Sequence, residues 1–311
     1  MAKIQRAELT LLYDLSGLDA GDEGYIDLAE SLSMLNRKLF EQGRLYHISS
    51  IETVLSTPNA QGVNQGDFCN IGVARAPNTW VTANAWYKAL KTWQAMRAEV
   101  LDKNPSLQSK WDDFKVYLNN DHFDAGQTNN LTPAFSKEGE WNMATMTLPD
   151  WSVGDTAKEF EVGLCDDDVG SVPAGNLTYG GIIYNYQESR ARVSGGQPDV
   201  PANASLSWGI RLLDMGGQES ELTDQIIGEN DYPPYDLDEY PGTSANEPLT
   251  LMGMVTANAY NLEQSRPGGY VPCGVLKVNL SDDSQPLMGP GLVIRMTPGT
   301  YKGVHAPTMR Q

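Results

Sequence analysis

The sequence has few of the side chains that nucleophilic or metal-dependent catalysis uses. Among its 311 residues are only three histidines, His47, His122 and His305. No phosphate-binding loop, GxSxG nucleophile turn or zinc-ligand spacing is present. We therefore expect a protein that binds or assembles, and not an enzyme.

Cysteine and long apolar runs are also scarce. The three cysteines, Cys69, Cys165 and Cys273, have unrelated spacings. Such spacings do not form a disulfide framework, so we expect each to be a small buried hydrophobe. No signal peptide is evident, and no apolar run approaches the roughly 18 residues of a membrane span.

Basic side chains are scarce as well. The chain has 22 Lys and Arg against 40 Asp and Glu, a net charge of −18. Binding to a nucleic-acid backbone depends on clustered Lys and Arg, and neither a cluster nor a basic N-terminal arm occurs. Direct binding to nucleic acid, a genome included, is therefore doubtful. The acidity indicates solubility or a saline medium, with a cation-dependent contact as the alternative.

Short apolar segments with strand-like patterns dominate the rest. They are separated by connections rich in Gly, Pro and Asn, which is typical of an all-β protein with many turns. Residues 45–56 and 67–76 could pair as a hairpin with a long loop. The predicted strands are 3–15, 45–56, 67–76, 111–119 (or a helix end), 140–149, 159–165, 204–215, 249–258, 270–280 and 291–299.

Two helices are expected early in the chain. The first covers about residues 26–42, where leucines recur at helical spacing, Asp27 caps the start and Gly43 supplies a stop. The second covers 84–103 and ends before Pro105. Its aromatic stripe predicts a buried face. We find no domain boundary, so residues 1–311 are predicted to be one domain.

Carboxylates in two loops are the main candidate metal ligands. Asp166 and Asp168 follow a predicted strand, and Asp236 and Asp238 lie in DYPPYDLDEY. Calcium prefers oxygen ligands from such loops, although the spacing matches no EF-hand. A structural Ca²⁺ is one interpretation, and solvated loop charge is the other. No other cofactor is expected. His122 could join a metal site only with ligands from distant residues.

A resemblance to one protein family runs over nearly the whole chain. The segments that carry it are 25–48, 76–93, 113–126, 140–150, 232–242, 270–278 and 297–309. The best-matched pieces are the Trp-rich start of the second helix and the run GTYKGVHAP near the C-terminus. Together these segments resemble the capsid proteins of small circular single-stranded DNA viruses.

This resemblance implies a jelly roll, two antiparallel sheets packed face to face with loops that build subunit contacts. The strand count suits a single jelly roll with helical insertions, and a double jelly roll is the alternative. The chain lacks the family's basic genome-binding arm. Another basic protein, metal ions or polyamines could offset the phosphate charge instead, or an internal membrane could lie beneath the shell.

The sequence therefore predicts a major capsid protein of a virion that is assembled in the host cell. Its partners would be further copies of itself in an icosahedral shell, with minor capsid proteins as further candidates. The alternatives are a carbohydrate- or receptor-binding β-sandwich of the fibre or spike type, and a β-sandwich hydrolase. The predicted interface residues are Trp80, Trp86, Tyr232, Tyr235, Tyr240, Tyr301 and His305.

Overall fold

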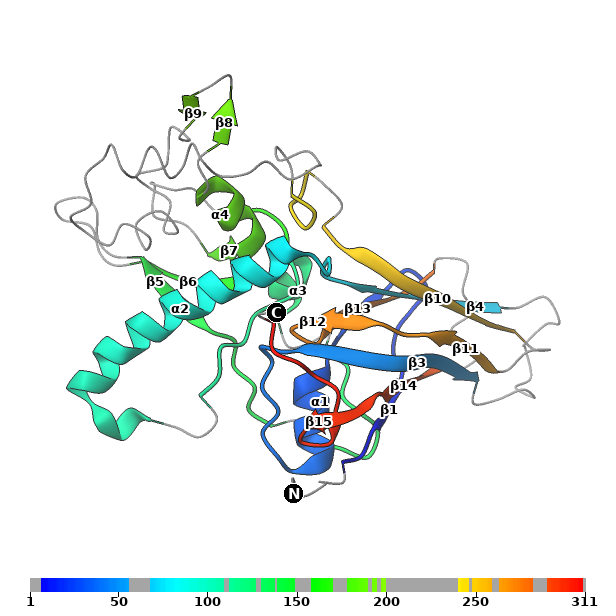
Figure 1. Ribbon diagram of the computed structural model, residues 1–311. Helices are drawn as coiled ribbons and strands as arrows, with labels where there is room; N and C mark the ends of the chain where they lie inside the picture. Colours follow the sequence, from blue (N-terminus) through cyan, green and yellow to red (C-terminus); the bar gives the residue numbers. More distant parts are fainter. Residues whose placement is uncertain are drawn as a thin grey trace.

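Two antiparallel sheets form a sandwich-like body in the computed structural model (Figure 1). The first sheet has the order β1-β14-β3-β11, with β12 also paired to β3, and the second has the order β10-β4-β13-β2. Their bounds are β1 (Thr10–Asp14), β2 (Glu23–Asp27), β3 (Leu45–Leu55), β4 (Phe68–Arg75), β10 (Thr250–Asn258), β11 (Glu263–Pro267), β12 (Tyr270–Pro272), β13 (Val275–Leu280) and β14 (Pro290–Met296).

The structure describes most of the chain. The residues that it describes are 7–55, 68–108, 112–126, 130–137, 139–148, 158–169, 178–189, 192–194, 197–199, 240–245, 248–258, 263–281 and 290–309.

The sandwich strands pair in a nested order. β1 pairs with β14, β2 with β13, β3 with β11, and β4 with β10, all antiparallel. Early strands thus pair with late strands, and the innermost pair is β4 with β10. Two further pairings, β14 with β3 and β13 with β4, join these strand pairs into the two sheets.

Alternating side chains build the core between the sheets. On β4, Cys69, Ile71 and Val73 are fully buried while their neighbours are only partly covered. On β1, Leu11 and Tyr13 are fully buried, which confirms the alternation predicted there. The buried face of each strand therefore has the period of two that a sheet requires. All three cysteines are free and buried, as predicted.

Helix α1 (Leu28–Asn36) follows β2 directly. Asp27 caps it as predicted, because its carboxylate accepts hydrogen bonds from the backbone N–H groups of Ala29 and Glu30. The predicted stop at Gly43 is wrong. The helix ends at Asn36 because Arg37 adopts a left-handed conformation with φ 52°.

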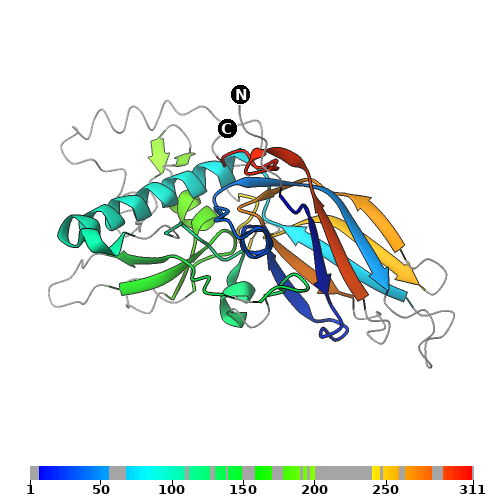
Figure 2. The ribbon, with the colours of Figure 1, turned by 90° about the horizontal axis from the view of Figure 1, so that it is seen from below.

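A large insertion between β4 and β10 lies at one end of the sandwich (Figures 1 and 2). Its longest helix, α2, begins before the predicted residue 84, because Thr79 caps it by accepting from the Thr82 N–H. The small sheet has the order β5-β6-β7. The elements are α2 (Trp80–Lys103), the 3₁₀ helix η1 (Pro105–Leu107), α3 (Asn120–Ala125), β5 (Thr145–Leu148), β6 (Lys158–Gly163), β7 (Tyr179–Gly181), α4 (Ile182–Ser189), β8 (Arg192–Ser194) and β9 (Gln197–Asp199).

Several predicted strands differ from the structure. The hairpin of 45–56 with 67–76 is wrong, because β3 and β4 belong to different sheets. Residues 112–119 are a loop with one bridge, from Tyr117 to Gly163. The 270–280 segment is divided into β12 and β13 by a turn at Cys273 and Gly274, both at positive φ. The predicted strand 204–215 lies outside the described residues.

The C-terminal segment folds back on itself after β14. Strand β15 (Pro298–Tyr301) is followed by a turn, and both Pro298 and Tyr301 form bridges with Val304. The backbone N–H of His305 donates to the Thr297 carbonyl oxygen, and that of His47 donates to the His305 carbonyl oxygen. The segment therefore packs against the end of β3.

Candidate functional site

Two predicted interface residues from distant parts of the chain meet in one aromatic cluster. The ring centroids of Trp80 and Tyr240 lie 6.1 Å apart, and Tyr186 of α4 lies 6.4 Å from Trp80 and 6.2 Å from Tyr240. The Lys88 ammonium lies 4.7 Å from the Tyr186 ring centroid. Trp80 is 40% exposed whereas Tyr240 is 2% exposed. Trp80 is therefore the member that can contact another molecule, and Tyr240 supports it from beneath.

Trp86 lies in the interior. It is 6% exposed and packs near Phe114, with ring centroids 6.3 Å apart. Within the described residues its indole N–H has no hydrogen-bond partner. Gly43 passes directly over the ring, where any added Cβ would collide with it. Trp86 thus fixes α2 onto the body of the protein and presents almost no surface.

Tyr301 connects the C-terminal segment to the chain after α1. Its hydroxyl accepts a hydrogen bond from the Glu41 N–H at 2.9 Å, and the Arg44 guanidinium lies 3.5 Å from the centre of its ring. His305 lies in a second group with His47 and Tyr270. The two C-terminal interface candidates are therefore both half-buried and anchored.

The acidic loop after β6 lines a pocket of about 590 Å³. Asp166 accepts from the Asn120 N–H, and Asp168 accepts from the Gly181 N–H and the Asn185 side-chain amide. Burial, followed by the nearby charges of Asp121 and Asp167, raises the pKa of Asp166. The two predicted ligands are thus each held by a hydrogen bond from the chain itself.

No group of three or more His, Cys, Asp or Glu side chains among the described residues is arranged to hold a metal ion. Asp236, Asp238, Tyr232 and Tyr235 lie outside the described residues. The Ca²⁺ site that joins these aspartates to Asp166 and Asp168 therefore stays a prediction.

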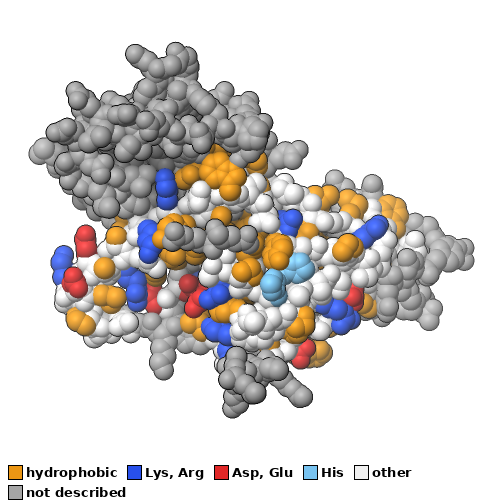
Figure 3. Space-filling view, in the orientation of Figure 1, with side chains coloured by type: hydrophobic (Ala, Val, Ile, Leu, Met, Phe, Trp, Pro, Cys, Tyr) orange, Lys and Arg blue, Asp and Glu red, His pale blue; other side chains and the backbone are white. Residues whose placement is uncertain are grey.

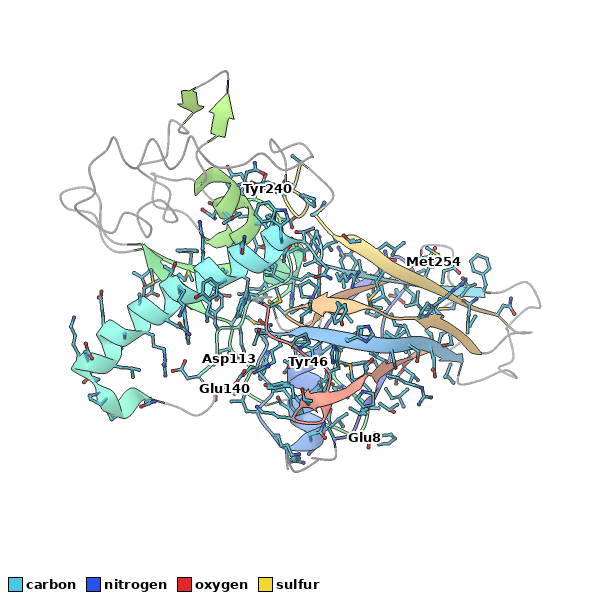
Figure 4. The ribbon with its side chains drawn as sticks, viewed as in Figure 1. Glu8, Tyr46, Asp113, Glu140, Tyr240 and Met254 are labelled. Atoms are coloured by element: carbon cyan, nitrogen blue, oxygen red, sulfur yellow. The ribbon has the colours of Figure 1, made fainter. Side chains whose placement is uncertain are left out.

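The second pocket, of about 780 Å³, lies where the insertion meets α1. Its lining includes four carboxylates, those of Glu30, Asp112, Asp113 and Glu140, and the tryptophans Trp93 and Trp141. Figure 4 labels Asp113 and Glu140. Desolvation raises the pKa of Asp113 to about 6. Asp112 forms an ion pair with Arg97.

A buried polar network lies beneath this second pocket. The Asp27 carboxylate accepts from the Gln42 side-chain amide at 2.9 Å and from the Trp141 indole N–H at 2.8 Å. Gln42 also bonds both backbone polar groups of Val116, and its own N–H donates to Asp113. Burial raises the pKa of Asp27. Sequence reasoning identified only the capping role of Asp27, because no local pattern links these residues.

His122 is a structural side chain in the described region. The Leu118 N–H donates to its Nδ1, so the ring proton resides on Nε2 and donates to the Asn130 side-chain oxygen at 3.0 Å. The ring stacks on Tyr25 with centroids 4.2 Å apart. Desolvation lowers the pKa of His122 to about 4. This arrangement uses both ring nitrogens within the protein.

Comparisons with family models, with curated proteins and with solved structures find no match. In the described part of the chain, no helix combines the length and the apolar character needed to cross a membrane.

Proposed function

We propose that this chain is a capsid protein with a single jelly-roll fold that assembles with copies of itself into an icosahedral virus shell. The nested strand pairing carries the proposal. With β12 left aside as a three-residue strand, the order of the sandwich strands in the chain is β1, β2, β3, β4, β10, β11, β13 and β14. In that numbering the first pairs with the eighth, the second with the seventh, the third with the sixth and the fourth with the fifth.

That pairing is the defining feature of a jelly roll. A jelly roll is an eight-stranded antiparallel hairpin wrapped into two sheets, with two Greek keys, and it is found in viral capsid and lectin domains. The wrapping creates sheets of order 1-8-3-6 and 2-7-4-5, which are the two strand orders of the sandwich. A double jelly roll would need a second such set. The remaining described strands are short, and β6 pairs with β7 in parallel.

Self-assembly into a closed shell requires at least two different contact surfaces on each subunit. Trp80 and its aromatic cluster provide one candidate. Strand β10 provides another, because it is a sheet edge and its Leu251 and Met254 are 59% and 49% exposed (Figure 4). An exposed apolar sheet edge promotes pairing with another chain unless it is covered. Contact between copies would cover it.

In this proposal the chain is structural and has no catalytic role. The large pocket with its two tryptophans is the observation that favours the carbohydrate-binding alternative. However, Trp141 is 5% exposed and the Lys115 ammonium lies 4.9 Å from its ring centroid. Trp93 is half-buried, with the Arg97 guanidinium 5.6 Å and the Phe114 ring centroid 5.7 Å from its ring centroid. At most one tryptophan of the pocket offers part of its ring to a sugar, so self-assembly is the better supported function.

The test is the native mass of the purified chain, with negative-stain microscopy of the same sample. Megadalton particles of uniform diameter are the expected result. A monomer, dimer or trimer that persists across protein concentration, ionic strength and pH would contradict the proposal and favour the binding module. Binding to a panel of immobilised glycans, measured in parallel, tests that alternative directly.

A further inference from the structure

Two of the three histidines of the chain lie together with an arginine at one end of the sandwich. The rings of His47 on β3 and Tyr270 on β12 have centroids 4.5 Å apart, and the Tyr270 hydroxyl lies 3.2 Å from Nε2 of His305. The two histidine rings are 5.9 Å apart. Histidine side chains are open on the face seen in Figure 3, next to hydrophobic side chains. We call His47, His305, Tyr270 and Arg75 the histidine–arginine cluster.

Arg75 is the last residue of β4 and is half-buried. Its guanidinium passes close to Gly269, where a Cβ would lie 3.2 Å from Nη1. Its Nε and Nη1 are both buried, and neither has a hydrogen-bond partner among the described residues. Buried N–H donors on a charged group are costly when they are unpaired, and in native proteins they almost always have a partner.

The charge of Arg75 is not balanced by a carboxylate in the described part of the chain. Burial, followed by the charges of His305 and Arg75, lowers the pKa of His47, and desolvation lowers the pKa of Arg75. The ion pairs of the described residues include none of His47, His305 and Arg75. Arg75 is therefore the cation of the cluster and has no carboxylate partner among these residues, although the chain as a whole has a net charge of −18.

We propose that the histidine–arginine cluster binds carboxylates of a neighbouring copy of this chain, so that it is one half of a contact between subunits. The inference rests on the proposed self-assembly and names one of its surfaces. The half-buried Arg75 guanidinium suits a carboxylate, which can accept several hydrogen bonds at once. The Tyr270 hydroxyl and Nδ1 of His47 hydrogen-bond within the chain, to His305 and Thr297.

A second copy is the occupant that the composition favours. Between residues 214 and 239 the sequence contains nine Asp or Glu residues and no Lys, Arg or His. Copies of so acidic a chain repel one another, and the Arg75 cation at the contact opposes that repulsion locally. The same charge pattern would also fix the orientation of the two copies, since acidic surface against acidic surface is disfavoured.

The test compares association of the wild-type chain with that of Arg75→Gln, measured by light scattering and analytical ultracentrifugation. We expect Arg75→Gln to weaken association by about tenfold or more, and Arg75→Lys, which keeps the charge, to weaken it less. Arg266→Gln is the matched control, because it removes one exposed positive charge on β11. It should leave association within about twofold of wild type.

The double variant His47→Gln with His305→Gln tests the contribution of the two imidazole rings of the cluster. Thermal unfolding of each variant establishes that it is folded. If wild type forms particles and Arg75→Gln forms them equally well, the inference fails and the proposed function stands. If Arg75→Gln lowers monomer stability without changing association, its carboxylate partner belongs to the same chain and the inference fails. If millimolar citrate stabilises the wild type through Arg75 without competing with association, the site binds a free anion instead. A wild-type chain that never associates overturns both proposals.

Discussion

The side-chain amide of Gln42 donates a hydrogen bond to the carboxylate of Asp27, 2.9 Å away, in the interior of the protein. Gln42 is fully buried and Asp27 is 3% exposed. Through this pair the cap of α1 is connected to Val116 and Asp113 of the insertion. The junction between the sandwich and the insertion thus contains a satisfied polar network.

Replacing Gln42 should reveal how much that network contributes. Gln42→Leu removes a donor from Asp27 and leaves both backbone polar groups of Val116 without their partner. Since each buried polar group left unpaired costs about 1–3 kcal/mol, we expect a loss of roughly 3 kcal/mol or more in the free energy of unfolding. Urea denaturation measures it. Gln94→Leu on the exposed side of α2 is the control, and an equal effect there would contradict the assignment.

Asp113 should make the protein less stable as the pH rises. Its pKa in the folded state is about 6, above the ordinary value of 3.8, so the folded state binds its proton more tightly. The favourable contribution is complete below about pH 4 and is lost as the pH rises through 6. A pKa difference of this size corresponds to about 3 kcal/mol.

Asp113→Asn should therefore gain stability relative to wild type between pH 4 and 7, because the amide carries no charge and can still accept from Gln42. Thermal unfolding across that range measures the difference between the two proteins. A difference that is constant with pH would show that Asp113 does not titrate in this window.

His122 should have the opposite effect, and make the protein less stable as the pH falls. Its pKa in the folded state is about 4, below the ordinary value of 6.5, so its contribution is complete above 6.5 and is lost as the pH falls through 4. This pKa difference again corresponds to about 3 kcal/mol in the free energy of unfolding. Protonation would also break the bond that Nδ1 accepts from Leu118. His122→Asn should be less stable at pH 8 and lose less on acidification to pH 5. Unfolding curves at the two pH values test this, and an equal loss of stability in His122→Asn and the wild type on acidification would contradict the assignment.

Two tryptophans of α2 should respond differently to truncation. Trp86→Ala removes a core side chain and should lower the free energy of unfolding by about 3–5 kcal/mol. Trp80→Ala should lower it by about 1 kcal/mol while reducing self-association, because the ring is 40% exposed. Sedimentation velocity together with denaturant unfolding separates the two effects. Normal particle formation by Trp80→Ala would remove this residue from the proposed interface.

The sequence predicted elements whose pattern is local. The leucine spacing after Asp27 predicted α1 and the Trp-rich stretch predicted α2. Alternation predicted β1, and short apolar runs between turn-rich connections predicted β4 and β10. Strand β2 was missed because its residues EGYID contain only two strongly apolar side chains and run directly into α1. Strand β11 was missed because EQSRP is polar, as suits an edge strand exposed to solvent.

The site could be predicted only in part, for a physical reason. Trp80 meets Tyr240, and Arg75 lies beside Gly269, across sequence separations that no periodicity encodes. The aromatic stripe of residues 84–103 predicts a buried face that includes Trp86, but no local pattern indicates that Gly43 covers it while Trp80 stays at the surface. The pairing of distant strands determines which of these residues become neighbours, and that pairing depends on the whole chain.

The nested strand order has a consequence for synthesis. Because β1 pairs with β14, the first sheet cannot close until the chain through β14 has left the ribosome. The innermost pair, β4 with β10, must bring together segments separated by the whole insertion. Such long-range contacts fold slowly. We therefore expect the first sheet to close only after β14 has emerged, which leaves unpaired strand edges exposed to chaperones, or to sister chains, in the interval.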